Sequence, residues 1–265
     1  ALAEGVDAVF ADPARRAAGR RLTDPEQWSP ALSRVLALRE RVEALGVKVA
    51  PGIDHALLPA DSHAQWVSVD GDVVEAGIWC GPLAPEGPGR SALCLRTGPD
   101  GVARPHVLHD PACTNPSSPP EQLDPITGPE DLSPFIHEPD GAVIRAGLVA
   151  EVARRLGARP VGDRIAYLTG DAPAPAELAP FVRSWRLVDV LPLHVKALRA
   201  RVRQDRIGRL EIHKRGVDQS PDLLRKQVRP SGAESETWLL TRVGARDTGS
   251  ARGTVLVVET VPEAG

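Results

Sequence analysis

An apolar run, an Asp-Pro pair and two cations follow one another in Val6-Asp7-Ala8-Val9-Phe10-Ala11-Asp12-Pro13-Ala14-Arg15-Arg16. The apolar run, residues 6–11, predicts a β-strand, and apolar residues then recur at roughly helical spacing from Leu32 until Gly46. A second apolar run, residues 47–50, is ended by Pro51-Gly52. Two strands joined by a helix predict a βαβ unit, which should be parallel and right-handed.

The sequence after this unit predicts strands that run antiparallel. Residues 65–69 and 73–80 flank Asp70-Gly71-Asp72, in which Asp-Gly is a strong hairpin-turn signal, and residues 91–96 predict one more strand. Residues 97–134 are rich in Pro, Gly, Ser and Asp and show no sustained periodicity, so we interpret them as a linker or extended surface loop with a domain boundary. The fold class of this part is therefore α/β, a sheet that ends in antiparallel strands.

The rest of the chain alternates between the two periodicities. Helical spacing from Ala142 to Leu156 and a predicted short strand at 164–168 come first. The order βαβαββ follows, which predicts a small α+β domain, with strands and helices at 185–191, 193–202, 209–212, 222–228, 238–243 and 254–260.

Composition indicates a globular protein. The chain has 265 residues, of which 42% are hydrophobic and 25% charged, enough to bury a sizeable core. No run approaches the roughly 20 apolar residues that cross a bilayer, and no basic segment followed by an apolar one opens the chain, so we expect no membrane and a cytoplasmic location. Cysteines are sparse and odd in number, which fits a reducing compartment, and Cys80 and Cys94 sit in apolar runs typical of a core.

Charge is distributed unevenly along the chain. Residues 1–124 hold 11 Lys/Arg against 17 Asp/Glu, and residues 125–265 hold 21 against 18. Residues 183–229 hold 13 against 5, an excess of 13 − 5 = 8 positive charges. Such an excess is an electrostatic footprint for a polyanion, or alternatively a solvated helix face.

The Asp-Pro pair is the first candidate site. Ligands of open α/β sheets bind at the carboxyl ends of the strands, where the rigid Pro13 would hold the Asp12 carboxylate toward a donor group on a substrate. Alternatively, Asp12-Pro13 only ends the strand and the cations that follow are solvated. His55 shares this edge if the two strands are neighbours, and it is a candidate base or phosphate ligand. Alternatively, Asp54 caps a short helix and His55 is an exposed helix residue.

Two other constellations lie further along. His106, His109 and Cys113 are spaced like zinc ligands, but no further ligand pair stands nearby, so we expect no metal. Arg209, Lys214 and Arg215 flank a predicted strand end before a glycine, which would present cations and backbone N–H groups to phosphates. The alternative is a basic turn between a strand and a helix.

Several separated segments carry a resemblance to one family. They are Asp7 to Arg16 with Gly19-Arg20-Arg21, Val47 to His55, Glu138-Pro139-Asp140 with Ile144 to Gly147, and Gly208 to Ile212 with Lys214 to Asp218. In this order they resemble bacterial class I S-adenosylmethionine-dependent methyltransferases that carry a C-terminal THUMP-like domain.

The resemblance implies a domain layout. Residues 1–110 would form the C-terminal half of a Rossmann-like methyltransferase sheet, 111–134 a linker, 135–180 a connecting helix and strand segment, and 181–265 the THUMP-like α+β domain. The family's Gly-rich first-strand loop and the acidic residue that binds the cofactor ribose do not appear in the chain. We therefore expect the main cofactor site to lie upstream of Ala1, in a chain that is N-terminally truncated and inactive alone. A start at Ala1 without Met, five residues before a strand, supports the same expectation.

The resemblance also implies a function, the methylation of RNA (rRNA or tRNA) with S-adenosylmethionine as cofactor. Asp12, Pro13, Ala14 and Arg15 would be the catalytic motif of the fourth strand, with Asp12 orienting the target amine. Related enzymes often have Pro and an aromatic residue where this chain has Ala14-Arg15. The expected RNA contacts are Arg16, His55, Arg209, Lys214 and Arg215. The alternative function is a non-catalytic RNA-binding or interaction module on the same fold, and the sequence does not predict an oligomeric state.

Overall fold

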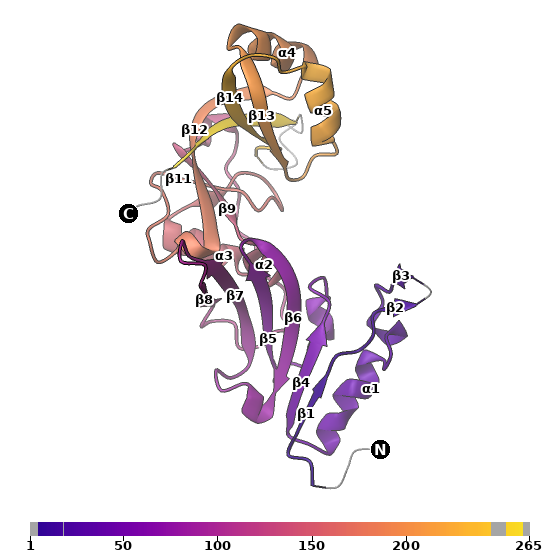
Figure 1. The fold of residues 1–265 in the computed structure, drawn as a ribbon. Coiled ribbons are helices and arrows are strands. Elements are labelled where there is room, and N and C mark those ends of the chain that lie inside the picture. The colour runs from indigo at the N-terminus through magenta and orange to yellow at the C-terminus, as the bar shows by residue number, and fades with distance from the viewer. Residues whose placement is uncertain (1–4, 18, 245–252, 262–265) are drawn as a thin grey trace. The chain divides into compact units, whose positions relative to one another are not determined.

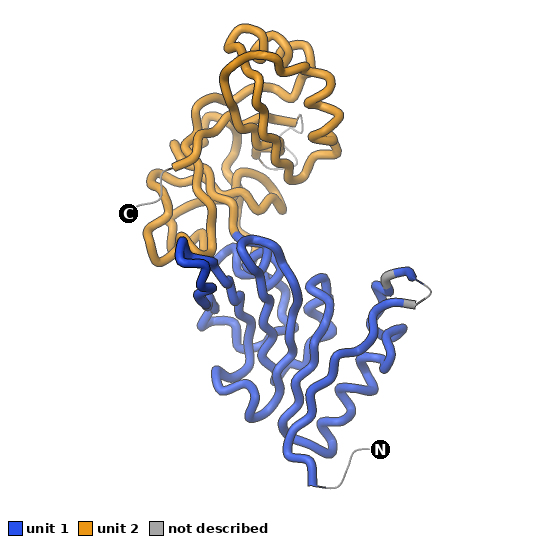
Figure 2. Tube along the Cα trace, in the orientation of Figure 1, with its two compact units in different colours: residues 1–121, 140–151 blue, residues 122–139, 152–265 orange. Residues whose placement is uncertain are grey.

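The computed structural model describes residues 5–17, 19–244 and 253–261 (Figure 1). The chain divides into two compact units (Figure 2). Unit 1 contains residues 1–121 and 140–151, and unit 2 contains residues 122–139 and 152–265. No helix in the described ranges has the length and apolar character needed to span a membrane.

Unit 1 is built on a six-stranded sheet in the order β1-β4-β6-β5-β7-β8. The pairs β1–β4 and β5–β7 are parallel and the other neighbours are antiparallel. The predicted parallel unit and the predicted hairpin around Asp70 and Gly71, both at positive φ, are confirmed. The strands are β1 Ala8–Ala11, β4 Ala44–Val49, β5 His63–Val69, β6 Asp72–Cys80, β7 Gly89–Thr97 and β8 Ala103–His109.

Short elements complete unit 1. A two-stranded ribbon, β2 and β3, follows β1, and a helical segment then leads to β4. In chain order these elements are β2 Arg16–Ala17, β3 Arg20–Arg21, η1 Pro25–Gln27, α1 Leu32–Leu36, η2 Ala37–Glu40, η3 His55–Leu57, η4 Gly81–Leu83 and α2 Gly141–Arg145.

Three predictions in this part of the chain are wrong. The helix does not continue to Gly46, because residues 44–49 form β4, whose apolar side chains are buried inside the sheet. Residues 97–134, predicted as a linker or loop, contain a regular strand, β8. This edge strand is mostly exposed and therefore lacks the apolar alternation that would have revealed it. The single helix 142–156 is two helices, α2 and α3 (Val149–Leu156), because Gly147 adopts a left-handed conformation between them.

Unit 2 is built on a seven-stranded sheet in the order β10-β11-β9-β12-β15-β14-β13, in which β13 and β14 are parallel. The predicted βαβαββ order is confirmed by β12, α4, β13, α5, β14 and β15, and the α+β character with it. The bounds are η5 Pro129–Asp131, β9 Phe135–Pro139, β10 Arg159–Pro160, β11 Leu168–Gly170, η6 Ala179–Phe181, β12 Val182–Pro192, α4 Val195–Gln204, β13 Ile207–Lys214, α5 Pro221–Val228, β14 Glu234–Thr241 and β15 Thr254–Thr260.

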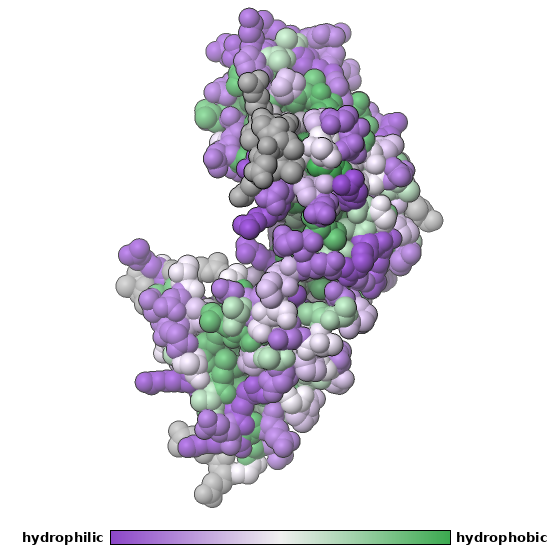
Figure 3. Space-filling view, turned by 180° about the vertical axis from the view of Figure 1, so that it is seen from behind, coloured by the Kyte–Doolittle hydropathy of each residue, from purple (hydrophilic) through white to green (hydrophobic). Residues whose placement is uncertain are grey.

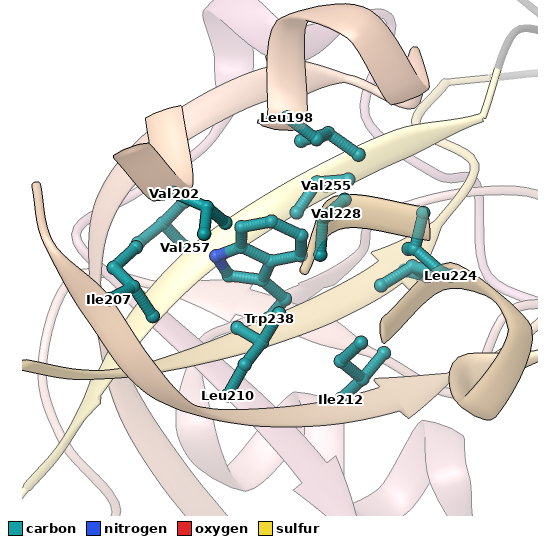
Figure 4. Packing of buried hydrophobic residues seen from close by; sticks show 11 residues of the cluster. Leu198, Val202, Ile207, Leu210, Ile212, Leu224, Val228, Trp238, Val255 and Val257 are labelled. Atoms are coloured by element: carbon teal, nitrogen blue, oxygen red, sulfur yellow. The ribbon is translucent and has the colours of Figure 1, made fainter. Parts of the chain in front are cut away.

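The core between the sheet of unit 2 and the helices α4 and α5 surrounds Trp238 (Figure 4). Leu198 and Val202 reach it from α4, and Leu224 and Val228 reach it from α5, each pair four residues apart on one helix face. These side chains and Trp238 are almost fully buried. Burying a large apolar side chain contributes about 1.5 to 3 kcal/mol, so this cluster holds both helices on the sheet.

His137 is a buried titratable group on β9, an interior strand of the sheet of unit 2. Its Nδ1 lies 2.9 Å from Ser184 Oγ, and its Nε2 has no hydrogen-bond partner among the described residues. Burial lowers the pKa of His137 to about 4. Between this pH and the ordinary value near 6.5, the unfolded chain binds a proton that the folded protein does not. The stability that the neutral ring provides is therefore complete above about pH 6.5 and is lost as the pH falls toward 4.

We expect the free energy of unfolding to fall by about 2 kcal/mol through His137 alone between pH 7 and pH 5. Urea titration at the two pH values measures this dependence. The variant His137→Phe cannot take up the proton. Its free energy of unfolding should therefore fall by about 2 kcal/mol less between pH 7 and pH 5 than that of the wild type. His109→Gln, at an exposed position on β8, should keep the wild-type dependence. Equal pH dependence in His137→Phe and the wild type would contradict the assignment.

Candidate functional site

An open hollow of about 360 Å³ lies at the carboxyl end of β1. Its lining consists of the five residues that follow the strand and one side chain from the neighbouring strand β4, namely Asp12, Pro13, Ala14, Arg15, Arg16 and Lys48. The structure therefore brings together the four predicted catalytic residues and Arg16. It also adds Lys48, which was not among the predicted site residues.

Backbone hydrogen bonds hold the segment that forms the hollow. The N–H of Ala14 donates to the Ser29 carbonyl at 2.8 Å, and Ser29 donates back at 3.1 Å. The Arg15 carbonyl accepts from the Leu22 N–H at 2.8 Å, and Pro13 is buried. Backbone hydrogen bonds to Ser29 and Leu22 thus fix the segment that follows Asp12. This fixed backbone positions the side chains around the opening.

Lys48 links two carboxylates on one face of the sheet. Its Nζ lies 3.3 Å from Asp12 Oδ2 and 3.4 Å from Glu75 Oε2. The register explains the contact, since Ala11 pairs with Val47 and Lys48 pairs with Gly77 on β6, two residues from Glu75. The two carboxylates raise the pKa of Lys48 above its ordinary value, and Asp12 has the larger effect. The side chain therefore stays charged at neutral pH.

The chemistry of the hollow follows from its charges. The lining holds one carboxylate, Asp12, and three cations, Arg15, Arg16 and Lys48, and Lys48 also pairs with Glu75 outside the lining. A carboxylate oxygen accepts a hydrogen bond from an amine or hydroxyl, which would hold such a nucleophile in place. The surplus of positive charge attracts an anion such as a phosphate. The arrangement suits a substrate with a donor group beside an anionic one.

Apolar surface adjoins the ion pairs on the same face of the sheet. Phe10, Gly46 and Trp79 form one row across β1, β4 and β6. The two rings lie 6.1 Å apart, and a Cβ on Gly46 would meet both at less than 3 Å. Phe10 is 62% exposed, and Figure 3 shows hydrophobic surface gathered on unit 1. The glycine therefore lets two aromatic side chains lie over the middle strand.

His55 does not line the hollow. Asp54 accepts from the Ala56 N–H at 3.0 Å and caps η3, as the alternative interpretation predicted, but His55 is half-buried and not exposed. His55 Nδ1 accepts a hydrogen bond from the buried Arg90, which leaves Nε2–H to donate to the Arg145 carbonyl at 2.8 Å. Burial, aided by the charge of Arg90, lowers the pKa of His55 and keeps the ring neutral. Both ring nitrogens are thus engaged in contacts within unit 1.

The three predicted RNA contacts of the C-terminal part lie in unit 2 and differ in their surroundings. Arg209 and Lys214 are exposed on β13. Arg215 donates from Nε to Glu138 Oε1 at 2.8 Å and lies over the Tyr167 ring at 5.5 Å. Arg215 is therefore held by protein contacts, whereas the other two side chains extend into solvent.

The sequence did not predict the ion pairs that Lys48 forms with Asp12 and Glu75. The available signal was a charged residue inside the apolar run 47–50, because a charge on a buried strand requires a partner. Among the described residues, no group of three His, Cys, Asp or Glu side chains could hold a metal ion. The three cysteines are free thiols, and Cys80 and Cys94 are buried as predicted.

We expect His55→Ala to lower the free energy of unfolding by about 2 kcal/mol, because Arg90, which is 4% exposed, keeps the Ser118 carbonyl but loses its ring-nitrogen acceptor. His109→Ala removes an exposed ring from β8 and should cost less than about 0.5 kcal/mol. Denaturant titration compares the two variants. Equal stability would mean that the His55 contacts do not support the fold.

Comparisons with known proteins place this site in context. Residues 182–259 match the family described as THUMP domain-like. The chain is 33% identical over 241 residues to two uncharacterized S-adenosylmethionine-dependent methyltransferases of Mycobacterium tuberculosis, from strains CDC 1551 and H37Rv. Both alignments cover 89% of this chain but only 60% of the relative.

A solved structure shows the same fold. It comes from Porphyromonas gingivalis W83, is described as a candidate methyltransferase, and matches with a TM-score of 0.69 at 19% identity over 96% of this chain and 60% of that one. The expected fold class is thereby confirmed. The chain is related in sequence to proteins named as S-adenosylmethionine-dependent methyltransferases, and its residues 182–259 form a THUMP-like region.

Proposed function

We propose that the protein is an S-adenosylmethionine-dependent methyltransferase that acts on RNA, with the hollow after β1 as the place where the target nucleophile is held. One observation carries the proposal. Asp12 stands at the carboxyl end of a parallel strand, in an open hollow, fixed by Lys48. Ligands of open α/β sheets bind at this edge. The names of the Mycobacterium tuberculosis relatives support the reaction class.

Asp12 orients the acceptor in this proposal. Its carboxylate accepts a hydrogen bond from the exocyclic amine of a nucleobase, which turns the nitrogen lone pair toward the methyl donor. Lys48 is a positioning residue, because its ammonium group holds one Asp12 oxygen and leaves the other available. Pro13, Ala14 and Arg15 shape the wall of the hollow, and Arg16 is available for a neighbouring phosphate.

S-Adenosylmethionine supplies an electrophilic methyl group. The lining of the hollow fits the acceptor better than this donor, since three cations stand there and Asp12 is the one carboxylate. A positively charged sulfonium gains little from such a wall, and the lining offers no second acidic side chain for ribose hydroxyls. We therefore assign these residues to the RNA and no cofactor contact to them.

The RNA part of the proposal rests on unit 2. Its THUMP-like region, residues 182–259, contains the whole basic stretch 183–229. Exposed Arg209 and Lys214 support the proposed docking, whereas Arg215 and His55 are engaged with other residues of their units. Ribosomal and transfer RNA are the proposed substrates, and a cytoplasmic location accords with the three free cysteines.

A second candidate function is a non-catalytic RNA-binding module. Two observations favour it. Ala14-Arg15 departs from the Pro and aromatic residue that the family resemblance often implies at these positions, and Asp12 forms an ion pair with Lys48. Measuring methyl transfer separates the two functions, because the module would bind RNA without modifying it.

We expect Asp12→Asn in the full protein to lower the rate of methyl transfer by a factor on the order of 100 or more, since the amide holds the target amine less well. Lys48→Met should lower it by about tenfold, because Asp12 loses its support. Asp100→Asn removes an exposed carboxylate from the turn before β8 and should leave the rate unchanged.

Transfer of labelled methyl groups from S-adenosylmethionine into total RNA, followed by nucleoside mapping, gives these rates. Wild-type activity in Asp12→Asn would remove Asp12 from the mechanism. RNA binding by the wild type without any methyl transfer would favour the module.

A further inference from the structure

We propose that α4 and α5 together form the surface with which the protein docks on the phosphate backbone of an RNA duplex. This inference rests on the proposed function, which makes RNA the substrate, and adds the place and the kind of contact. The surface, here called the α4–α5 surface, consists of Lys196, Arg203, Arg206, Lys226 and Arg229.

The topology of unit 2 brings these side chains to one side. Helix α4 leads into β13 and α5 leads into β14, and the two strands are parallel neighbours. Both helices therefore end at the same edge of the sheet. Arg199 of α4 donates from Nε at 2.9 Å to the carbonyl of Gln227 in the last turn of α5, which joins the two helices. The helices thus lie together over one sheet face.

The turns that follow the helices are also joined. The Arg206 carbonyl accepts from the Glu234 N–H at 3.0 Å, and the Ile207 carbonyl accepts from Ser231 at 2.9 Å. A Cβ on Gly232 would overlap the Arg206 carbonyl, so only glycine permits the crossing. Arg206 and Arg229 occupy corresponding places, each just after a helix and each at positive φ. The crossing keeps these two cations at one edge.

Three of the acidic residues near this surface are already neutralised, since Asp189 and Asp205 both pair with Arg201, and Asp222 pairs with Arg225. The exposed Glu234, whose N–H bonds the Arg206 carbonyl, is one carboxylate set against the five cations. All five cations of the α4–α5 surface are exposed, and none forms an ion pair with a residue in the described ranges. The surface therefore presents uncompensated positive charge, which a polyanion neutralises with release of its counterions.

Helix stability does not explain the whole pattern. Cations in the last turn favour a helix, which accounts in part for Arg203 and Lys226. Lys196 is the second residue of α4, where a cation opposes the helix dipole. On α4, Lys196 and Arg203 lie seven residues apart and so share one face. A binding surface along that face explains both positions.

The aromatic residues of unit 2 favour a duplex over single-stranded RNA. Tyr167, Trp185 and Trp238 are fully buried in the core, Phe181 is buried, and Phe135 on β9 is half-buried. Unpaired bases are usually recognised by stacking on exposed aromatic side chains, and none of these five side chains is exposed. The cations of the α4–α5 surface can bind phosphates, which a duplex presents along both strands.

The test uses the full protein with Lys196, Arg203, Arg206 and Lys226 all changed to Gln. The matched control changes four exposed cations on other surfaces, Arg34, Arg41, Arg104 and Arg186, to Gln. Fluorescence anisotropy with a labelled RNA duplex of about 20 base pairs measures affinity between roughly 50 and 200 mM salt. Thermal unfolding of each variant confirms that it is folded.

We expect the surface variant to bind about 10 to 100 times more weakly at the lowest salt, with a salt-dependence slope smaller by about 3, because each lost phosphate contact removes nearly one unit. The control should stay within about threefold of the wild type. Equal weakening of the two variants, or none in the surface variant, would overturn the proposed surface. A loss seen with single-stranded RNA but not with the duplex would overturn the duplex assignment. Absence of RNA binding by the wild type would instead contradict the proposed function.

Discussion

The parallel pairing of β1 with β4 is the interaction on which the candidate site depends. It aligns Ala11 with Val47, so that the residue after each, Asp12 and Lys48, reaches the same edge and the same face. The contact could not form with the strands shifted by one residue, because every side chain would then turn to the opposite face. A short edge strand of four residues thus holds the carboxylate against its cation through backbone register.

The close approach of these strands also depends on glycine. Gly46 and Gly77 lie under the Trp79 ring on neighbouring strands, and a Cβ at either position would crowd it. The ring therefore packs flat across the middle of the sheet beside Lys48 and Glu75. The ion pairs consequently have apolar surface on one side and open solvent on the other, an environment in which a charged contact keeps some strength and remains accessible.

Unit 2 carries many cations, which repel one another, on a small domain. Trp238 and the apolar faces of α4 and α5 form its core, while Arg201 binds three carboxylates, those of Asp189, Asp205 and Glu236. Because Arg201 takes up three carboxylates and Arg225 pairs with Asp222, the five cations of the α4–α5 surface remain exposed to solvent. Repulsion among these cations lowers the stability of the unit, and the burial of apolar side chains in the core offsets this loss.

The sequence by itself determined the strands with clear apolar periodicity, the hairpin at Asp70-Gly71 and the βαβαββ order of unit 2, because local pattern and turn chemistry dictate these features. It also indicated that the first strand ends at Asp12, and it predicted the helix cap at Asp54 as one of two alternatives. Only the tertiary structure decided what these residues touch. Lys48 meets Asp12 through strand register, His55 is engaged by Arg90 from a distant strand, and the exposed strand β8 is set by its pairing with β7. Such contacts join residues far apart in sequence, and their partners are selected by the folded backbone rather than by local pattern.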